Sequence, residues 1–168
     1  MQSITLEQFN GYLQGQGKSR YDVCNLDWQV NLGEHWLLLG ANGAGKSALT
    51  AALIGEAKCE SGKRISSINK LMLVSSDSHK QLLAQELEHE KHTLVKDLIF
   101  TGHSNNDELL AQLIELFKFS SLLNRHFRDL STGETRKLLL IKGLSSHSEL
   151  VVLDEPFHGL DVQSCQQL

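Results

Sequence analysis

The chain has 168 residues, of which 40% are hydrophobic and 21% are charged, and its formal net charge is −4. This length and composition suit one globular domain, and the lack of a polybasic run gives no sign of direct nucleic-acid binding. No apolar run reaches the roughly 18 residues that a membrane-spanning helix needs, residues 1–5 lack a signal-peptide pattern, and three widely spaced cysteines favour free thiols in a cytoplasmic protein.

Residues 3–32 alternate between apolar and polar side chains, first at Ile4 and Leu6 and again from Val23 to Val30. A period of two predicts short, half-buried antiparallel strands. The apolar run Trp36–Leu39 predicts a short buried strand, and residues 46–56 predict a helix.

Residues 40–47 join that predicted strand to the helix and read Gly-Ala-Asn-Gly-Ala-Gly-Lys-Ser. The spacing Gly-x4-Gly-Lys-Ser is a Walker A phosphate loop. Its glycines allow positive φ and a close approach of phosphate oxygens, and the helix N-terminus favours an anion. We expect Lys46 to reach the β- and γ-phosphates and Ser47 to ligate Mg²⁺. The expected phosphate-binding residues are Gly40, Asn42, Gly43, Ala44, Gly45, Lys46, Ser47 and Ala48.

The middle of the chain changes from strand-like to helical spacing. Residues 65–74 predict one or two strands, and residues 79–147 predict a helical insert. One predicted helix carries a single apolar stripe, formed by Leu109, Leu110, Leu113, Ile114, Leu116 and Phe117. A second carries Leu138–Ile141 and Leu144. The run Leu150–Leu153 then predicts a strand buried on both faces, as in a parallel sheet.

Two carboxylates, Asp154 and Glu155, follow this last strand, and Pro156 comes next. An apolar strand that ends in Asp-Glu is typical of a Walker B site. We expect Asp154 to hold Mg²⁺ and Glu155 to activate the attacking water as a general base. Proline biases the preceding residue toward extended geometry, so we expect Pro156 to end the strand.

Ser131 and Glu134 have the spacing of a capping box, in the run Leu-Ser-Thr-Gly-Glu at residues 130–134. This spacing predicts that a helix begins at Ser131. A helix N-terminus is also a site at which an anion binds favourably.

These three motifs, in this order, resemble the nucleotide-binding domain of ABC ATPases over nearly the whole chain. Residues 122–168 resemble the first cassette of the ModF-type, or PhrA-like photorepair, members of that family. The resemblance implies an α/β fold: a P-loop NTPase cassette with an N-terminal antiparallel β subdomain, a RecA-like and mostly parallel sheet core, and an inserted helical subdomain. Residues 1–78 would hold the β subdomain and Walker A part, residues 79–147 the helical subdomain, and residues 148–168 the Walker B strand and D-loop.

The resemblance also implies a site shared between two cassettes, with ATP and Mg²⁺ as ligands. Ser131 and Gly133 would contact the γ-phosphate of ATP bound to a second cassette, and Asp161 would lie in the D-loop that couples the two sites. An aromatic ring near the first strands would stack on adenine, with Tyr12 as the first candidate, Tyr21 as the second and Phe9 as the third. The partner would be a second copy or a C-terminal cassette, with a membrane permease at the inner face of the plasma membrane.

The chain departs from the family pattern at three places. Ser75-Ser76-Asp77 stands where the family has a lid-loop glutamine, and the signature carries Thr132 and Glu134 in place of glycine and glutamine. Glu134 would repel phosphate unless its charge turns to the helix backbone, as in a capping box. The sequence ends at Leu168, before the family's switch histidine and closing strands, so we expect an incomplete cassette.

Three hypotheses remain open at this point. The chain is an ATPase that works with a second cassette in a transport cycle, with molybdate import implied by the ModF-type resemblance. Alternatively, it is a nucleotide-binding regulatory module that does not hydrolyse ATP. The third hypothesis is a fragment of a double-cassette protein of photorepair type.

Overall fold

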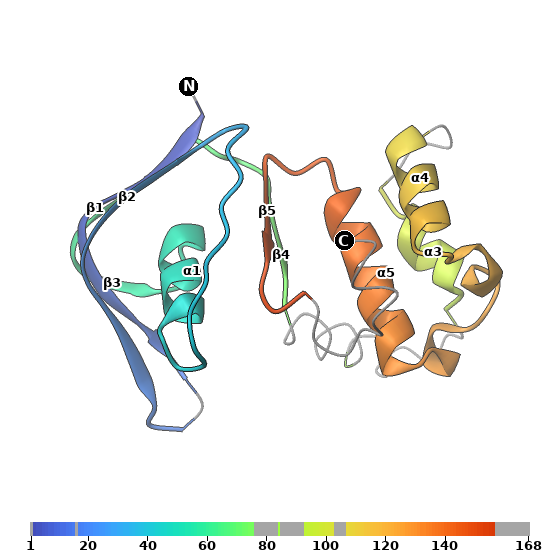
Figure 1. Ribbon diagram of the computed structural model, residues 1–168, viewed down its shortest axis with the longest axis horizontal. Coiled ribbons are helices and arrows are strands. Elements are labelled where there is room, and N and C mark those ends of the chain that lie inside the picture. The colour runs from blue at the N-terminus through green and yellow to red at the C-terminus, as the bar shows by residue number, and fades with distance from the viewer. Residues whose placement is uncertain (1, 16, 76–83, 85–92, 103–106, 157–168) are drawn as a thin grey trace. The chain divides into compact units, whose positions relative to one another are not determined.

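The alternating residues near the N-terminus form an antiparallel sheet, as the sequence predicts. In the computed structural model, which describes residues 2–15, 17–75, 84, 93–102 and 107–156, the strands are β1 (Ser3–Gln14), β2 (Arg20–Asn31) and β3 (Lys58–Ser66). Their order is β2-β1-β3, and β1 pairs antiparallel with both neighbours (Figure 1). The strands are longer than expected, because β1 continues through Gly11 with two shifts of register.

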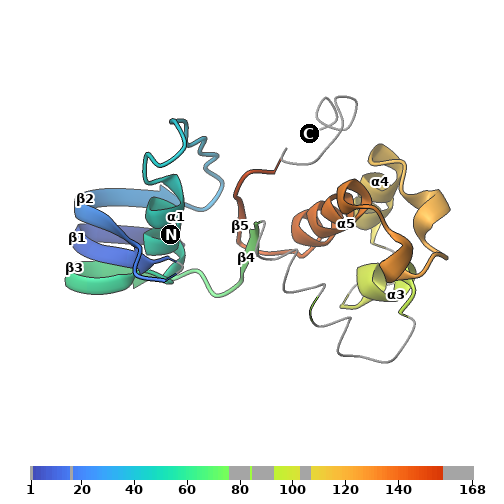
Figure 2. The same cartoon turned by 90° about the horizontal axis from the view of Figure 1, so that it is seen from below.

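Helix α1 (Lys46–Ile54) packs on this sheet through small side chains. Ala48, Ala51 and Ala52 are buried on the helix, and Ala52 shares a core with Leu6 and Phe9 of β1. Figure 2 shows the helix lying along the face of the three strands. Because alanine adds little bulk, the backbone of α1 can approach the sheet closely, and this contact positions the loop from which the helix starts.

The apolar run Trp36–Leu39 does not form the strand that the sequence predicts. It has no regular secondary structure, and 79% of Leu37 and 83% of Leu39 are exposed. An apolar run becomes a strand only when a neighbouring backbone pairs with it, and the described part of the chain offers this segment no such partner. The prediction of a buried strand is therefore wrong for this structure.

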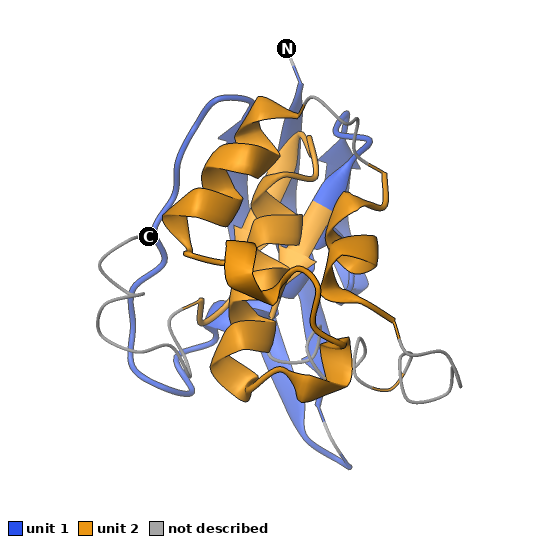
Figure 3. Ribbon diagram, turned by 90° about the vertical axis from the view of Figure 1, so that its right-hand side faces the viewer, with its two compact units in different colours: residues 1–71 blue, residues 72–168 orange. Residues whose placement is uncertain are grey.

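The chain divides into two units, residues 1–71 (unit 1) and residues 72–168 (unit 2), which Figure 3 colours separately. In unit 2, β5 (Leu150–Leu153) lies beside β4 (Leu71–Val74) in a parallel pair. The backbone N–H of Asp154 donates to the carbonyl of Val74 over 2.9 Å. The strand prediction for residues 150–153 is confirmed, but its full burial is not, because all four residues are half-buried beside a single described neighbour.

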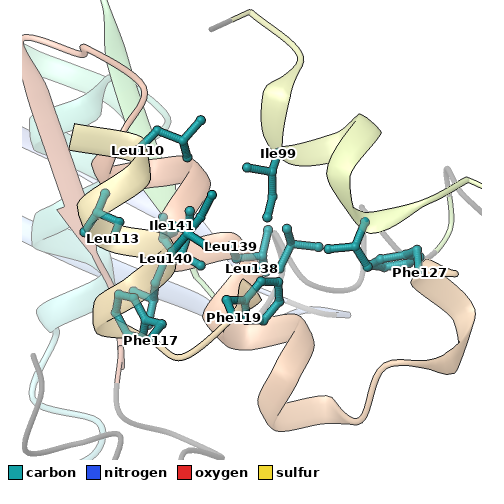
Figure 4. Packing of buried hydrophobic residues seen from close by; sticks show 13 residues of the cluster. Ile99, Leu110, Leu113, Phe117, Phe119, Phe127, Leu138, Leu139, Leu140 and Ile141 are labelled. Atoms are coloured by element: carbon teal, nitrogen blue, oxygen red, sulfur yellow. The ribbon is translucent and has the colours of Figure 1, made fainter. Parts of the chain in front are cut away.

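The helical part of unit 2 contains α3 (Val95–Phe100), α4 (Glu108–Leu116), the short 3₁₀ helices η1 (Ser120–Leu122) and η2 (Phe127–Asp129), and α5 (Thr132–Leu144). Side chains from these helices meet in one apolar core (Figure 4). Its buried members include Ile99, Leu110, Phe119, Leu138 and Leu140. None of the helices that the structure describes could span a lipid bilayer.

The apolar stripe on α4 is narrower than predicted. Leu110, Leu113 and Ile114 are buried, and Phe117 follows them at the next helical position. Leu109 and Leu116 are 41% and 45% exposed, so the sequence placed them on the stripe wrongly. Leu109 precedes the buried Leu110, and Leu116 precedes the buried Phe117. Successive helical residues are rotated by about 100°, and this rotation carries both leucines out of the core.

Candidate functional site

The loop at residues 40–47 contains two glycines with a left-handed backbone. Gly43 and Gly45 have φ values of 81° and 89°, in the left-handed region that glycine enters without steric cost. Gly40 is not in that region, contrary to expectation. A Cβ at Gly40 would lie 3.3 Å from the Cβ of Ala44, which is a tight contact. Glycine at this position therefore leaves room for the close approach of Ala44.

Lys46 brings a positive charge to this loop. Its Nζ donates to the carbonyls of Gly40, at 2.8 Å, and Ala41, at 2.9 Å. Lys46 is also the first residue of α1. The N-cap residue of this helix is Gly45, which has no side chain that could accept a hydrogen bond from the first amides. The ammonium group and the first amides of the helix therefore offer donors and positive charge to an anion.

The other predicted loop residues differ in what they expose. Asn42, Ala44 and Ser47 are exposed. Ala48, a residue of α1, is buried, so its side chain does not face a ligand. A chain of phosphates fits this donor set, because the loop offers backbone amides, glycines without side chains and one ammonium group.

Tyr12, the first candidate for adenine stacking, lies in β1 opposite Asp22 of β2 and Lys58 of β3. The guanidinium carbon of Arg20 lies 3.9 Å from the centre of the Tyr12 ring, within the range of a cation–π contact. Tyr21 is 49% exposed, whereas Phe9 is buried in the core of unit 1. Phe9 is therefore unavailable for stacking on a ligand in this structure.

In unit 2, the two carboxylates follow β5 in a turn that the sequence did not predict. Glu155 is exposed and has a φ of 52°, which is left-handed rather than extended. The expectation that Pro156 would hold Glu155 extended is therefore wrong. Such a backbone is uncommon for a residue with a side chain, and it persists only where the surroundings hold it.

The group that holds this turn is Arg136 of α5, a residue that the sequence motifs did not single out. Its Nη2 donates to the carbonyl of Asp154 over 3.0 Å and to that of Glu155 over 2.6 Å. The side chain is only 3% exposed, and burial lowers the pKa of Arg136, while the charges of Glu155 and Asp154 raise it. The sequence does contain a signal for this role, because Arg136 is a charged residue one helical turn before the buried Leu139 and Leu140.

The capping box at the start of α5 is confirmed. The backbone N–H of Ser131 donates to Oε2 of Glu134 over 2.7 Å, and the backbone N–H of Glu134 donates to Oγ of Ser131 over 3.3 Å. The first of these bonds is the main reason why the pKa of Glu134 lies below its usual value. The carboxylate therefore turns to the helix backbone, as the sequence predicts.

Several predicted residues lie outside the described part of the chain. They are Asp161 with the rest of the D-loop run and His158, and Ser76 and Asp77 after β4. For a divalent cation, Ser47 and Asp154 offer a hydroxyl and a carboxylate, which are the hard oxygen donors that Mg²⁺ takes.

Comparisons with known proteins agree with this set of motifs. The ABC transporter family model matches residues 23–158. The ABC transporter ATP-binding protein ModF of Escherichia coli (strain K12) is 37% identical over 153 residues, which cover 83% of this chain and 30% of ModF. The molybdate/tungstate import ATP-binding protein WtpC of Pyrococcus abyssi (strain GE5 / Orsay) is 30% identical over 154 residues, which cover 86% of this chain and 44% of WtpC. This chain thus spans less than half the length of either relative.

A solved structure supports the fold. An ABC transporter provisionally classed as metal-chelate type, in an inward-facing conformation, matches with a TM-score of 0.67 and 22% identity over 99% of this chain and 66% of that one. The predicted fold class, an α/β P-loop cassette, is therefore confirmed.

Proposed function

This chain belongs to the ABC transporter family, and we propose that it binds Mg-ATP at residues 40–47 and hydrolyses it when paired with a second cassette. The observation that carries the proposal is the loop itself. Gly43 and Gly45 take a left-handed backbone, and Lys46, the first residue of α1, donates from its ammonium group to the loop carbonyls of Gly40 and Ala41. Phosphate groups are the ligands that such a loop stabilises.

The proposed roles follow from the chemistry of each side chain. Lys46 stabilises charge on the β- and γ-phosphates, and Glu155 takes the proton of the attacking water. Ser47 and Asp154 hold Mg²⁺, which neutralises charge on the phosphate oxygens. Ser131 and Gly133, at the start of α5, bind the γ-phosphate held by the second cassette. Tyr12 stacks on adenine, and Asp161 couples the two sites.

The test of this proposal measures binding and phosphate release separately. The parent chain is expected to bind Mg-ATP and to release phosphate at chain concentrations at which it dimerises. Glu155→Gln removes the base and is expected to slow phosphate release about 100-fold or more, while Mg-ATP stays bound and dimers accumulate in light scattering. Glu115→Gln, an exposed change of the same charge on α4, is the control and is expected to behave as the parent does.

Two outcomes would count against the proposal. Turnover of ATP by Glu155→Gln at the parent's rate would show that Glu155 is not the base. Binding of Mg-ATP by the parent without phosphate release, even with a second cassette added, would favour the non-hydrolytic module instead.

For the cellular role, we propose a transport-type cycle at the cytoplasmic face of a membrane, with a permease as partner and molybdate as substrate. The support is the likeness to ModF and to WtpC, whose name includes molybdate and tungstate import. Other relatives are named for zinc import. The test uses cells that lack the chain and measures their molybdoenzyme activity at limiting molybdate and their growth at limiting zinc. Poor growth at limiting zinc, with normal molybdoenzyme activity at limiting molybdate, would overturn the choice of molybdate.

A further inference from the structure

Arg136 joins two parts of unit 2 that the proposed function uses separately. It lies on α5, five residues after Ser131, and its guanidinium group reaches the turn that carries Asp154 and Glu155. We propose that Arg136 is a positioning residue, which clamps the backbone of this turn so that the Glu155 carboxylate is held ready for the attacking water. This inference rests on the proposed role of Glu155 as the base.

The geometry of the clamp is specific. One nitrogen, Nη2, donates to two successive carbonyl oxygens, those of Asp154 and Glu155. Two successive carbonyls can point at one donor only if the chain turns between them, and Glu155 makes this turn with a φ of 52°. Strain of this kind persists where the surroundings fix the conformation. The two charge-assisted hydrogen bonds from Arg136 are such a constraint.

The position of Arg136 is unfavourable for a residue with only a packing role. Its guanidinium is almost fully buried, and its Nε has no hydrogen-bond partner within the described part of the chain. An apolar side chain at this place would avoid both the burial of charge and the unpaired donor. The neighbouring Leu138 and Leu139 show that α5 already carries apolar residues toward this core. What Arg136 provides beyond packing is its pair of donors to the carboxylate turn.

The pairing of β4 with β5 also holds the start of this turn. The backbone N–H of Asp154 donates to Val74 of β4, so the start of the turn is anchored by β4 and the carbonyls are anchored by α5. Without the guanidinium, Asp154 would keep its bond to β4, whereas the backbone at Glu155 would be free to leave the left-handed conformation. The side chain of Glu155 would then change direction without any loss of the strand pair.

The test uses the whole chain and three variants. Arg136→Met keeps a long apolar stem and removes every donor, Arg136→Lys keeps a charge and donors, and Arg128→Met is the matched control at an exposed arginine. Arg136→Met is expected to lower kcat for phosphate release about 100-fold, because a small displacement of a catalytic group has an effect of this size. The Kd for Mg-ATP is expected to stay within about threefold, since phosphate binding belongs to residues 40–47. Arg136→Lys is expected to recover most of kcat, and Arg128→Met is expected to match the parent.

Hydrogen exchange separates positioning from a general loss of structure. In Arg136→Met, amides in a peptide covering residues 150–156 are expected to exchange faster, while those of residues 132–144 keep the parent's rate. An unchanged kcat would overturn the proposal. Faster exchange throughout unit 2, with a fall in kcat that only follows the unfolded fraction, would overturn it as well.

If the parent binds Mg-ATP but releases no phosphate, the proposed function fails, and exchange in residues 150–156 alone decides on the clamp. Faster exchange there in Arg136→Met, and not in Arg128→Met, would support the clamp, whereas equal exchange in both variants would refute it.

Discussion

The phosphate loop of unit 1 and the carboxylate turn of unit 2 both use a left-handed backbone, but they stabilise it differently. In the loop, glycines at 43 and 45 take positive φ, which glycine adopts without steric cost. In the turn, Glu155 takes it despite its side chain, and the buried Arg136 holds the carbonyls in place. A loop that wraps a ligand with backbone amides can consist of glycine. The turn at Glu155 carries a side chain, and the hydrogen bonds from Arg136 hold its carbonyls.

The cores that support the two regions differ as well. The loop precedes α1, which packs on the sheet of unit 1 largely through alanines. The turn follows β5 in unit 2, where leucines and phenylalanines from several helices are fully buried around α5 (Figure 4). We infer that the geometry of the turn depends on hydrogen bonds from a helix that is packed in this core, whereas the geometry of the loop depends on local backbone freedom.

The largest expected effect is a loss of stability caused by a cavity in unit 2. Leu110→Ala removes a side chain that is 1% exposed and is expected to lower the free energy of unfolding by about 2–5 kcal/mol. Leu109→Ala, the same change at the adjacent and 41% exposed position, is expected to stay within about 0.5 kcal/mol of the parent. Urea unfolding followed by circular dichroism measures both. Equal losses for the two variants would mean that α4 does not bury the face described here.

The next effect concerns ligand binding in unit 1. Lys46→Ala removes the ammonium from the loop and is expected to weaken Mg-ATP binding by about 1.5–3 kcal/mol, roughly 10- to 150-fold. Stability should change little, because the two bonds of Lys46 go to loop carbonyls that water can also reach. Titration calorimetry gives the affinity, and Lys63→Ala on the exposed face of β3 is the control. An unchanged affinity in Lys46→Ala would remove this lysine from the site.

Two glycine substitutions compare the units directly. Gly45→Ala meets no neighbour, but it forces alanine to a φ of 89°, and we expect a loss of about 1–2 kcal/mol. Gly143→Ala has an ordinary helical backbone, but its Cβ would lie 2.5 Å from Cγ2 of Val74, so overpacking is expected to cost about 1–3 kcal/mol. The helix propensity of alanine offsets up to about 1 kcal/mol of this.

Asparagine distinguishes the two causes, because it tolerates the left-handed conformation better than alanine does. Gly45→Asn is expected to be more stable than Gly45→Ala, whereas Gly143→Asn is expected to be less stable than Gly143→Ala. Thermal unfolding of the four variants gives the order. The same order at both positions would show that the two substitutions destabilise for the same reason, rather than through backbone conformation at Gly45 and a steric clash at Gly143.

The sequence predicted the parts of this molecule that depend on local pattern. Strands β1 and β2, helix α1, strand β5 and the capping box at Ser131 were all readable, because periodicity and capping act over a few residues. The exposure of Leu37 and Leu39 was not readable, since burial of an apolar run depends on a partner strand far away in sequence. The left-handed Glu155 and the clamp by Arg136 were missed for the same reason, because they involve residues 18 and 19 positions apart.

The smallest expected effect is a pH dependence at the capping box of unit 2. The hydrogen bond from the Ser131 backbone lowers the pKa of Glu134 below its ordinary value of 4.5, so the folded state prefers the ionised carboxylate. The stability that results is fully present above about pH 4.5 and is lost as the pH falls through the lowered pKa of the folded state. Glutamine also fits this position of a capping box. Glu134→Gln should therefore be less stable than the parent by about 0.5–1 kcal/mol near pH 7.

This difference in stability is expected to shrink as the pH falls below about 4.5, the ordinary pKa of the group. Urea unfolding of the parent and of Glu134→Gln between about pH 3 and pH 7 measures it, with Glu115→Gln on α4 as a control of equal charge. A difference that stays constant over this range would mean that the Ser131 bond does not depend on the charge of Glu134. The position of the carboxylate would then rest on interactions other than the charge-dependent bond from the Ser131 backbone.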